Sequence, residues 1–100
     1  MKISIKKDFH DDAVTREAGE KLRKRIVESL RAGDKLELDF SGCLIASTSF
    51  FDEGIAKLAN EGFQSGAILR SLTITHLHPR DRELLEDLCR RRKFEGIILS

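Results

Sequence analysis

The sequence has no tryptophan or tyrosine, and six phenylalanines are its only aromatic residues. This weakens functions that need stacking platforms for bases or sugars, although phenylalanine can also stack. The 18 basic and 17 acidic residues leave a net charge near zero, so no overall field attracts nucleic acid. No apolar run approaches the ~20 residues that span a membrane, and the N-terminus lacks the apolar segment of a signal peptide. We therefore expect a cytoplasmic protein with no membrane partner.

Cysteine is also scarce, and Cys43 and Cys89 lie far apart without the spacing of a metal site. We interpret them as reduced thiols. An apolar share of 40% over 100 residues is enough for one modest core without a disulfide or metal. The sequence thus predicts a single domain over residues 1–100 that needs no cofactor and no metal.

The first half of the chain shows one helical and two strand patterns. Alternating isoleucines predict a strand over residues 2–7. Apolar residues then recur every four positions, which predicts a helix over about residues 12–32, capped by Asp11 or Asp12. Gly33 stands just past the end of this helix, where glycine is favoured. Residues 36–40 alternate again and predict the second strand.

The second half continues the alternation of strands and helices. A second helix is predicted after the turn at 47–49, with an inner stripe of Phe51, Gly54, Ile55, Leu58 and Gly62. The glycines of this stripe suggest close approach to a sheet. Residues 72–77 predict the third strand, Pro79 starts the third helix, and residues 96–99 are a fourth strand candidate. The order β-α-β-α-β-α-β predicts an α/β fold with three helices and about four strands in a largely parallel or mixed sheet.

A hydroxyl-rich turn, Ser47-Thr48-Ser49, stands between the second strand and the second helix. Such a position is where α/β domains present polar groups to a partner. The turn carries hydroxyls and carboxylates but neither histidine nor lysine, which favours a docking or phospho-acceptor surface over catalysis. Ser49 is also well placed as the helix N-cap, with Asp52 completing a capping box. That role explains one of the three hydroxyls.

Phe50 falls outside the inner stripe of the second helix, whereas Phe51 lies on it. A large apolar side chain at an exposed helix start is a candidate anchor for a partner protein. The alternative is that Phe50 packs under a neighbouring loop.

Asp39 lies near the carboxyl end of the second strand, where ligands of α/β proteins bind. It is a candidate partner-binding residue, or it caps a backbone group in the Ser41-Gly42 turn. His76 and His78 are two residues apart and so share a strand face, but no third metal ligand is evident. No nucleophile elbow, phosphate loop or paired-carboxylate signature is present, so we do not expect an enzyme.

The third helix ends in a basic run, residues 90–93, joined by Arg80 and Arg82. Cations at a helix C-terminus are favoured by its dipole, which makes a solvated helix the simple interpretation. The alternative is a patch for an acidic partner or RNA.

Residues 38–53, LDFSGCLIASTSFFDE, resemble the STAS-like family of unknown function DUF4325. In that family a strand ends in Asp-Phe. The turn after it has, in succession, a small residue, a hydroxyl-bearing residue, Phe, any residue, Asp and Glu. The upstream Thr15-Arg16-Glu17-Ala18 and Leu22-Arg23 also fit the first helix of that family. The resemblance covers residues 14–60 and implies a STAS-like sandwich.

Through that family the chain is distantly similar to anti-sigma-factor antagonists. These bind a serine kinase of the histidine-kinase-like ATPase class and are switched by phosphorylation of a hydroxyl at a helix start. Their Asp-Ser-Ser-Gly pattern falls on Ala46, Ser47, Thr48 and Ser49, so Thr48 matches the modified hydroxyl. The aspartate and the glycine are replaced here. Asp52 and Glu53 also stand close to any phosphate at this position and would repel it.

We therefore expect a regulatory protein-interaction domain that docks an ATPase-type kinase or a similar switch protein. The expected surface has Thr48, Ser47 and Ser49 as candidate phospho-acceptors. Its partner-binding residues are Phe50, Asp52, Glu53 and Asp39. The alternative function is a nucleic-acid accessory protein that uses the arginine-rich third helix, with binding that falls steeply with salt. The oligomeric state cannot be derived from the sequence.

Overall fold

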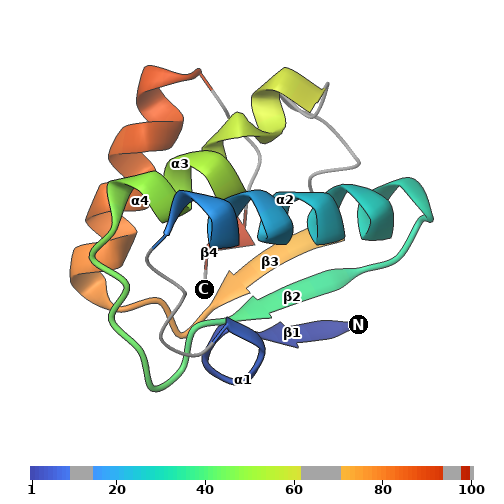
Figure 1. Ribbon diagram of the computed structural model, residues 1–100, viewed down its shortest axis with the longest axis horizontal. Helices are drawn as coiled ribbons and strands as arrows, with labels where there is room; N and C mark the ends of the chain where they lie inside the picture. Colours follow the sequence, from blue (N-terminus) through green and yellow to red (C-terminus); the bar gives the residue numbers. More distant parts are fainter. Residues whose placement is uncertain (10–14, 62–70, 94–97, 100) are drawn as a thin grey trace.

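The computed structural model describes residues 1–9, 15–61, 71–93 and 98–99 of the chain. Their helices and strands are ordered as follows (Figure 1): β1 (Lys2–Ser4), α1 (Ile5–Phe9), α2 (Arg16–Arg31), β2 (Leu36–Asp39), α3 (Thr48–Gly54), the 3-10 helix η2 (Ala56–Glu61), β3 (Leu72–Thr75), α4 (Pro79–Arg91) and β4 (Ile98–Leu99). None of the helices in these ranges is both long and apolar enough to cross a membrane.

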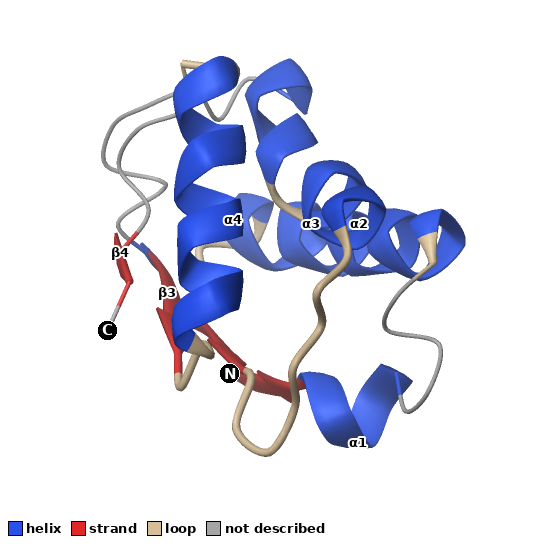
Figure 2. Ribbon diagram, turned by 90° about the vertical axis from the view of Figure 1, so that its left-hand side faces the viewer, coloured by secondary structure: helices blue, strands red, loops and turns tan. Residues whose placement is uncertain are grey.

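The strands form one sheet in the order β1-β2-β3-β4, and every neighbouring pair is parallel. Ile3 pairs with Leu38, and Leu38 with Ile74, so apolar side chains are in register across the three longer strands. The shortest strand, β4, pairs with β3 through two residues. Helices α2, α3 and α4 all lie on the same side of the sheet (Figure 2).

The two faces of the sheet differ in polarity. Ile3, Leu38 and Ile74 are fully buried and belong to the core. The intervening residues Glu37 and Thr75 are only half-buried, and a hydrogen bond of 2.7 Å from the Thr75 hydroxyl to Glu37 joins them. Because side chains alternate along a strand, the apolar set faces the helices and the polar set faces away from them. The described residues therefore form two layers, one of helices and one of sheet.

The first predicted strand is too long. The chain leaves the sheet after Ser4 and forms the short helix α1, which brings Ile5 and Phe9 to the same side, where both are buried. A helical turn can bury both because residues four apart share one face, whereas on a strand they would lie much further apart. The described residues thus hold four α-helices where three were predicted, while the α/β fold class is confirmed.

The end of α2 is as predicted from the sequence, whereas its start lies later in the chain than predicted. Thr15 is the N-cap, and its Oγ1 accepts a hydrogen bond of 3.0 Å from the Ala18 amide. The predicted caps, Asp11 and Asp12, lie outside the described residues. Gly33 follows the helix with a φ of +82°, as predicted for the residue after a helix end.

Helix α3 ends at Gly54, so the long second helix predicted from the sequence is wrong; the chain continues as the 3-10 helix η2. Gly54 does make a close approach, but to helix α2 and not to the sheet. A Cβ added at Gly54 would lie 3.2 Å from the Gly19 carbonyl oxygen, and a Cβ at Gly19 would lie 2.7 Å from that of Phe50. Glycine at both positions thus lets the two helix backbones touch. Gly62, the other predicted stripe glycine, lies outside the described residues.

The start of α4 is as predicted, with Pro79 at its first turn and His78 as N-cap. Leu85 and Leu88 are buried against the core, and Leu84 is half-buried. β4 lies within the predicted range 96–99, of which residues 96 and 97 are outside the described part.

Candidate functional site

The loop between β2 and α3 is held to the start of α4 by one buried carboxylate. Asp81 is only 1% exposed, and it accepts hydrogen bonds from the amides of Ile45 at 2.7 Å and Ala46 at 2.8 Å. Ala46 has a φ of +50°, a left-handed conformation that costs an L-residue about 1 kcal/mol or more. A charge-assisted pair of hydrogen bonds offsets this strain. The loop is therefore a defined surface and not a loose connection.

Exposure alternates along this loop. Leu44 is 47% exposed, Ile45 is buried in the core, Ala46 is exposed, Ser47 is half-buried and Thr48 is exposed. Besides Met1, Leu44 is the exposed large hydrophobic residue of the described part of the chain. We call Leu44, Ala46 and Thr48 the loop surface.

The three hydroxyls of the turn have different surroundings. Ser47, not Ser49, is the N-cap of α3, and its hydroxyl accepts a hydrogen bond of 3.2 Å from the Phe50 amide. The prediction of Ser49 as N-cap in a capping box with Asp52 is wrong by two residues. Ser49 instead accepts a long hydrogen bond of 3.4 Å from the Arg16 guanidinium. Thr48 is the first residue of α3, and it is the most exposed of the three.

Phe50 is fully buried, so the prediction that it is an exposed anchor is wrong. Its ring packs edge-on against Phe9, with centroids 6.1 Å apart, and against Phe51 at 5.8 Å. The alternative was packing under a neighbouring loop; Phe50 is indeed buried, but the element packed against it is the helix α1. Because α1 supplies Phe9, the helix that the sequence did not predict is also the element that covers Phe50.

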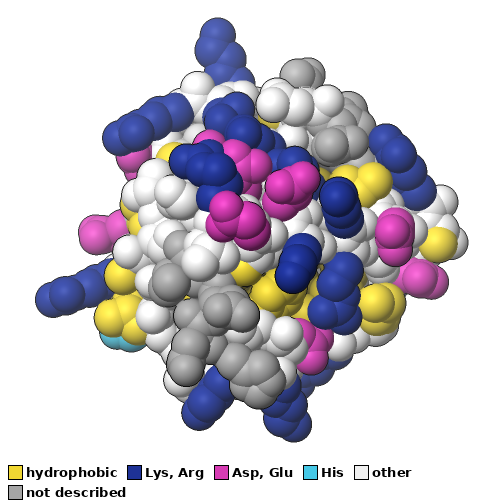
Figure 3. Space-filling model, in the orientation of Figure 1, with side chains coloured by type: hydrophobic (Ala, Val, Ile, Leu, Met, Phe, Trp, Pro, Cys, Tyr) yellow, Lys and Arg dark blue, Asp and Glu magenta, His cyan; other side chains and the backbone are white. Residues whose placement is uncertain are grey.

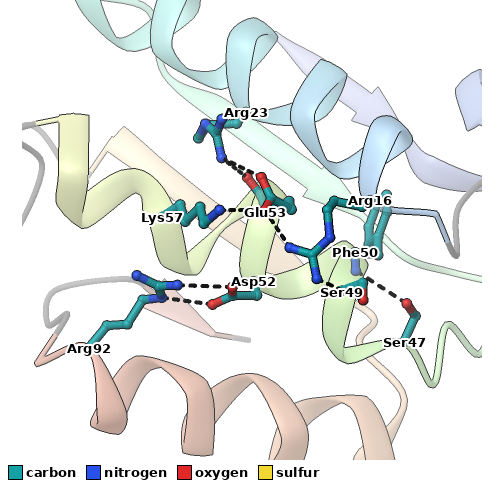
Figure 4. Close-up of polar contacts among 9 residues, drawn as sticks. All are labelled: Arg16, Arg23, Ser47, Ser49, Phe50, Asp52, Glu53, Lys57 and Arg92. Atoms are coloured by element: carbon teal, nitrogen blue, oxygen red, sulfur yellow. Dashed lines mark hydrogen bonds and ion pairs between the residues drawn. The ribbon is translucent and has the colours of Figure 1, made fainter.

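Glu53 is also buried, at 6% exposure, so it is not an open docking residue as expected. Three cations surround it (Figure 4): Arg16 at 2.5 Å, Arg23 at 3.2 Å, and Lys57. Arg23 also donates to the Glu53 carbonyl oxygen at 2.5 Å. The hydrogen bond from Lys57, followed by those from Arg16 and Arg23, lowers the pKa of Glu53 to about 2 despite burial. Glu53 thus joins α2, α3 and η2.

Asp52, the residue before Glu53, is paired with Arg92 at the end of α4. Two guanidinium nitrogens of Arg92 donate to the two carboxylate oxygens at 2.7 and 2.9 Å (Figure 4). The hydrogen bonds to Asp52 raise the pKa of Arg92. Four cations therefore accompany Asp52 and Glu53, and the repulsion of a nearby phosphate expected from the sequence is largely neutralised. Figure 3 shows acidic and basic side chains interspersed on this face of the molecule.

Asp39 caps the Ser41-Gly42 turn, as the second interpretation of the sequence proposed. It accepts hydrogen bonds from the Ser41 amide at 3.0 Å and from the Ser41 hydroxyl at 3.1 Å. Lys2 lies 3.4 Å away and the His76 Nδ1 3.0 Å away. The Ser41 amide contributes most to holding the pKa of Asp39 down, at about 2. The Asp39 side chain is 10% exposed, which leaves little of it for a partner.

His76 and His78 do not form a pair. β3 ends at Thr75, and His76 has a φ of +57°, so the alternation that would align the two rings is broken. His76 lies beside Asp39, whereas the Nδ1 of His78 accepts a hydrogen bond from the Arg80 amide at 3.1 Å. Among the described residues no group of three or more potential ligands is arranged to hold a metal.

The two cysteines are half-buried free thiols. Burial raises the pKa of both, that of Cys89 to about 11. Thiolate is the nucleophilic form of cysteine, so neither side chain is activated for catalysis.

The arginines of α4 are mostly paired with neighbouring carboxylates. Arg82 pairs with Glu86, and both Arg90 and Arg91 pair with Asp87, at 2.7 to 3.8 Å. These are exposed pairs within one helix, which contribute little stability individually. This pattern matches the solvated helix that was the simple interpretation of the basic run.

Sequence reasoning missed Asp81, Leu44 and the role of Arg16. Arg16 and Asp81 are more than thirty positions from the groups they contact, so no local pattern marks them. Leu44 stands in an apolar run, residues 43–46, so no alternation of apolar and polar residues distinguishes it from the buried Ile45.

The sequence model of DUF4325, described as a STAS-like domain of unknown function, matches residues 18–82. This range runs from α2 to the first turn of α4 and includes the loop surface, Glu53 and Asp81. The chain therefore belongs to this family, and its α/β fold is of the STAS-like type. No curated protein and no solved structure matched the chain at the significance required.

Proposed function

We propose that this chain is a regulatory protein-interaction domain that docks a partner through the loop surface, with Leu44 as its apolar anchor. The partner class is an ATPase of the serine-kinase type, as the similarity to anti-sigma-factor antagonists suggests. The domain acts by binding and not by catalysis, and it works in the cytoplasm. The observation that carries the proposal is an exposed leucine on a loop that Asp81 fixes in place.

A fixed loop supports docking because little conformational entropy is lost on binding. An aliphatic side chain that is about half exposed gains apolar burial when a partner covers it, about 25 cal/mol per Å². Phe50 and Glu53, the residues first expected to bind, are buried and serve the fold instead. The proposed contact area thus lies one turn earlier, at residues 44–48.

Thr48 is the proposed phospho-acceptor within this surface. It is the exposed hydroxyl of the turn, and it matches the modified position of the anti-sigma-factor antagonists. Arg16 reaches the neighbouring Ser49 hydroxyl at 3.4 Å, so a cation stands near a phosphate added at this helix start. A phosphate on Thr48 would add roughly −1.5 to −2 charge to the loop surface that includes Leu44 and weaken an apolar contact there.

The test uses an ATPase of the serine-kinase type as the partner. Leu44→Asp should weaken the complex by about thirtyfold or more, the size of a hot-spot loss of ~2 kcal/mol, without lowering the melting temperature. Lys24→Asp, at an exposed position of α2, is the matched control and should bind as the parent does. Equal binding of the Leu44→Asp variant would refute docking at this loop.

The phosphorylation test measures intact mass after incubation with that ATPase and ATP. One phosphoryl group is expected on the parent chain and none on Thr48→Val, with Ser41→Ala as a control for another exposed hydroxyl. A mass gain that survives Thr48→Val would contradict the assignment to Thr48. The nucleic-acid alternative has less support, because the α4 arginines are paired with carboxylates.

A further inference from the structure

A cavity of about 620 Å³ opens where β1 and β2 end, beside α1. Figure 1 shows both strands pointing toward this helix. The cavity is lined by Lys2, Ser4, Lys6, Lys7, Asp8, Asp39, Ser41 and Gly42. The carboxyl ends of β1 and β2, at Ser4 and Asp39, thus lie at the cavity.

The carboxylates of this cavity are already engaged by other groups. Asp8 pairs with Arg25 of α2 at 3.0 Å, and Asp39 is held by Ser41, Lys2 and His76. The ammonium groups of Lys6 and Lys7 make no ion pair with any described residue, although both line the cavity. Among the described residues, nothing compensates these two positive charges at one wall of the cavity.

Lys6 is seated against the turn that follows β2. A Cβ added at Gly42 would lie 3.2 Å from both the Cδ and the Nζ of Lys6, so the lysine stem crosses the position that a side chain would fill. Gly42 also has a φ of +79°, which L-residues rarely adopt. The turn therefore favours glycine at this point, and the absence of a side chain leaves room for the lysine stem. The Lys6 ammonium lies beside Gly42 at the cavity wall.

We propose that this cavity binds a phosphate dianion, either inorganic phosphate or the phosphate group of a small phosphomonoester. Lys6 and Lys7 supply the charge, as lysine does at many phosphate sites. The Ser4 hydroxyl lies in the same wall and can donate a further hydrogen bond, whereas the Ser41 hydroxyl already donates to Asp39. The volume exceeds that of phosphate alone, which leaves room for an organic group. The site is separate from the loop surface and does not depend on the docking proposal.

The test titrates isotope-labelled protein with inorganic phosphate and, separately, with glycerol 3-phosphate. The ionic strength is held constant, and the pH is kept above the pKa at which the phosphate becomes a dianion. Saturable shifts are expected at the amide resonances of Ser41, Gly42 and Lys7. The double variant Lys6→Met/Lys7→Met removes both charges while keeping the apolar stems. It should bind at least tenfold more weakly, which corresponds to about 1.4 kcal/mol.

Lys21→Met/Lys24→Met, two exposed lysines of α2, is the matched control and should bind as the parent does. Tighter binding of glycerol 3-phosphate would support an organic phosphomonoester, and equal affinities would support inorganic phosphate. Shifts that do not saturate, that chloride reproduces, or that survive in the Lys6→Met/Lys7→Met variant would overturn the proposal. A melting temperature of that variant close to the parent's confirms that the fold is retained.

Discussion

Truncation of Phe50 distinguishes a core residue from a docking anchor. The ring is fully buried between Phe9 and Phe51, with centroid separations of 6.1 and 5.8 Å. Replacing a buried phenylalanine with alanine removes its transfer free energy and leaves a cavity, at a cost of about 3–5 kcal/mol. Because the substitution also removes two edge-on ring contacts, we expect a cost in the upper part of that range.

The measurement is the free energy of unfolding of Phe50→Ala by urea titration. A loss of 3 kcal/mol in a domain of this size lowers the melting temperature by roughly 12 °C or more. Since small domains are stable by only about 5–15 kcal/mol, a loss of about 3–5 kcal/mol removes between about a fifth and all of that stability. Phe50→Leu keeps most of the apolar volume and gives a measurable intermediate loss of about 1–2 kcal/mol.

Leu44→Ala is the matched control for Phe50→Ala, because Leu44 is 47% exposed. A surface substitution of this kind changes stability by about 0.5 kcal/mol or less. If Phe50→Ala unfolds within 1 kcal/mol of the parent, the burial of Phe50 and the packing of α1 over it are refuted.

Two further predictions concern the contacts between α2 and α3. Glu53 has its pKa lowered from 4.5 to about 2, so its stabilisation is complete above about pH 5 and is lost as the pH falls toward 2. Asp39 titrates in the same window. Glu53→Gln should therefore remove part, but not all, of the loss of unfolding free energy between pH 5 and 2; an unchanged acid profile would contradict the role of this carboxylate. Gly19→Ala should destabilise by about 2 kcal/mol or more, because its Cβ would lie 2.7 Å from a backbone oxygen of Phe50. Gly33→Ala is the matched control: its Cβ position is open, and only its φ of +82° adds a cost of about 1 kcal/mol. Equal unfolding free energies of the two glycine variants would show that the helices do not touch at Gly19.

The sequence by itself determined the α/β class, the two long helices and the positions of the three main strands. These follow from local periodicity and from residues with strong backbone preferences, such as Pro79 at the start of α4 and Gly33 after α2. The residues 38–53 also sufficed to indicate the family that the comparison then showed. Local chemistry carries this information because it acts within one turn or one strand.

The tertiary structure alone decided which residues of the turn are available to a partner. Phe50 looked exposed because it lies off the stripe of its own helix, but α1 covers it from elsewhere in the chain. Glu53 and Asp52 looked free, yet cations from α2, η2 and the end of α4 pair with them across 4 to 40 positions. Asp81 shapes the loop from 35 and 36 residues away. Contacts of this kind depend on how distant segments pack together, and no pattern within a short window of sequence records them.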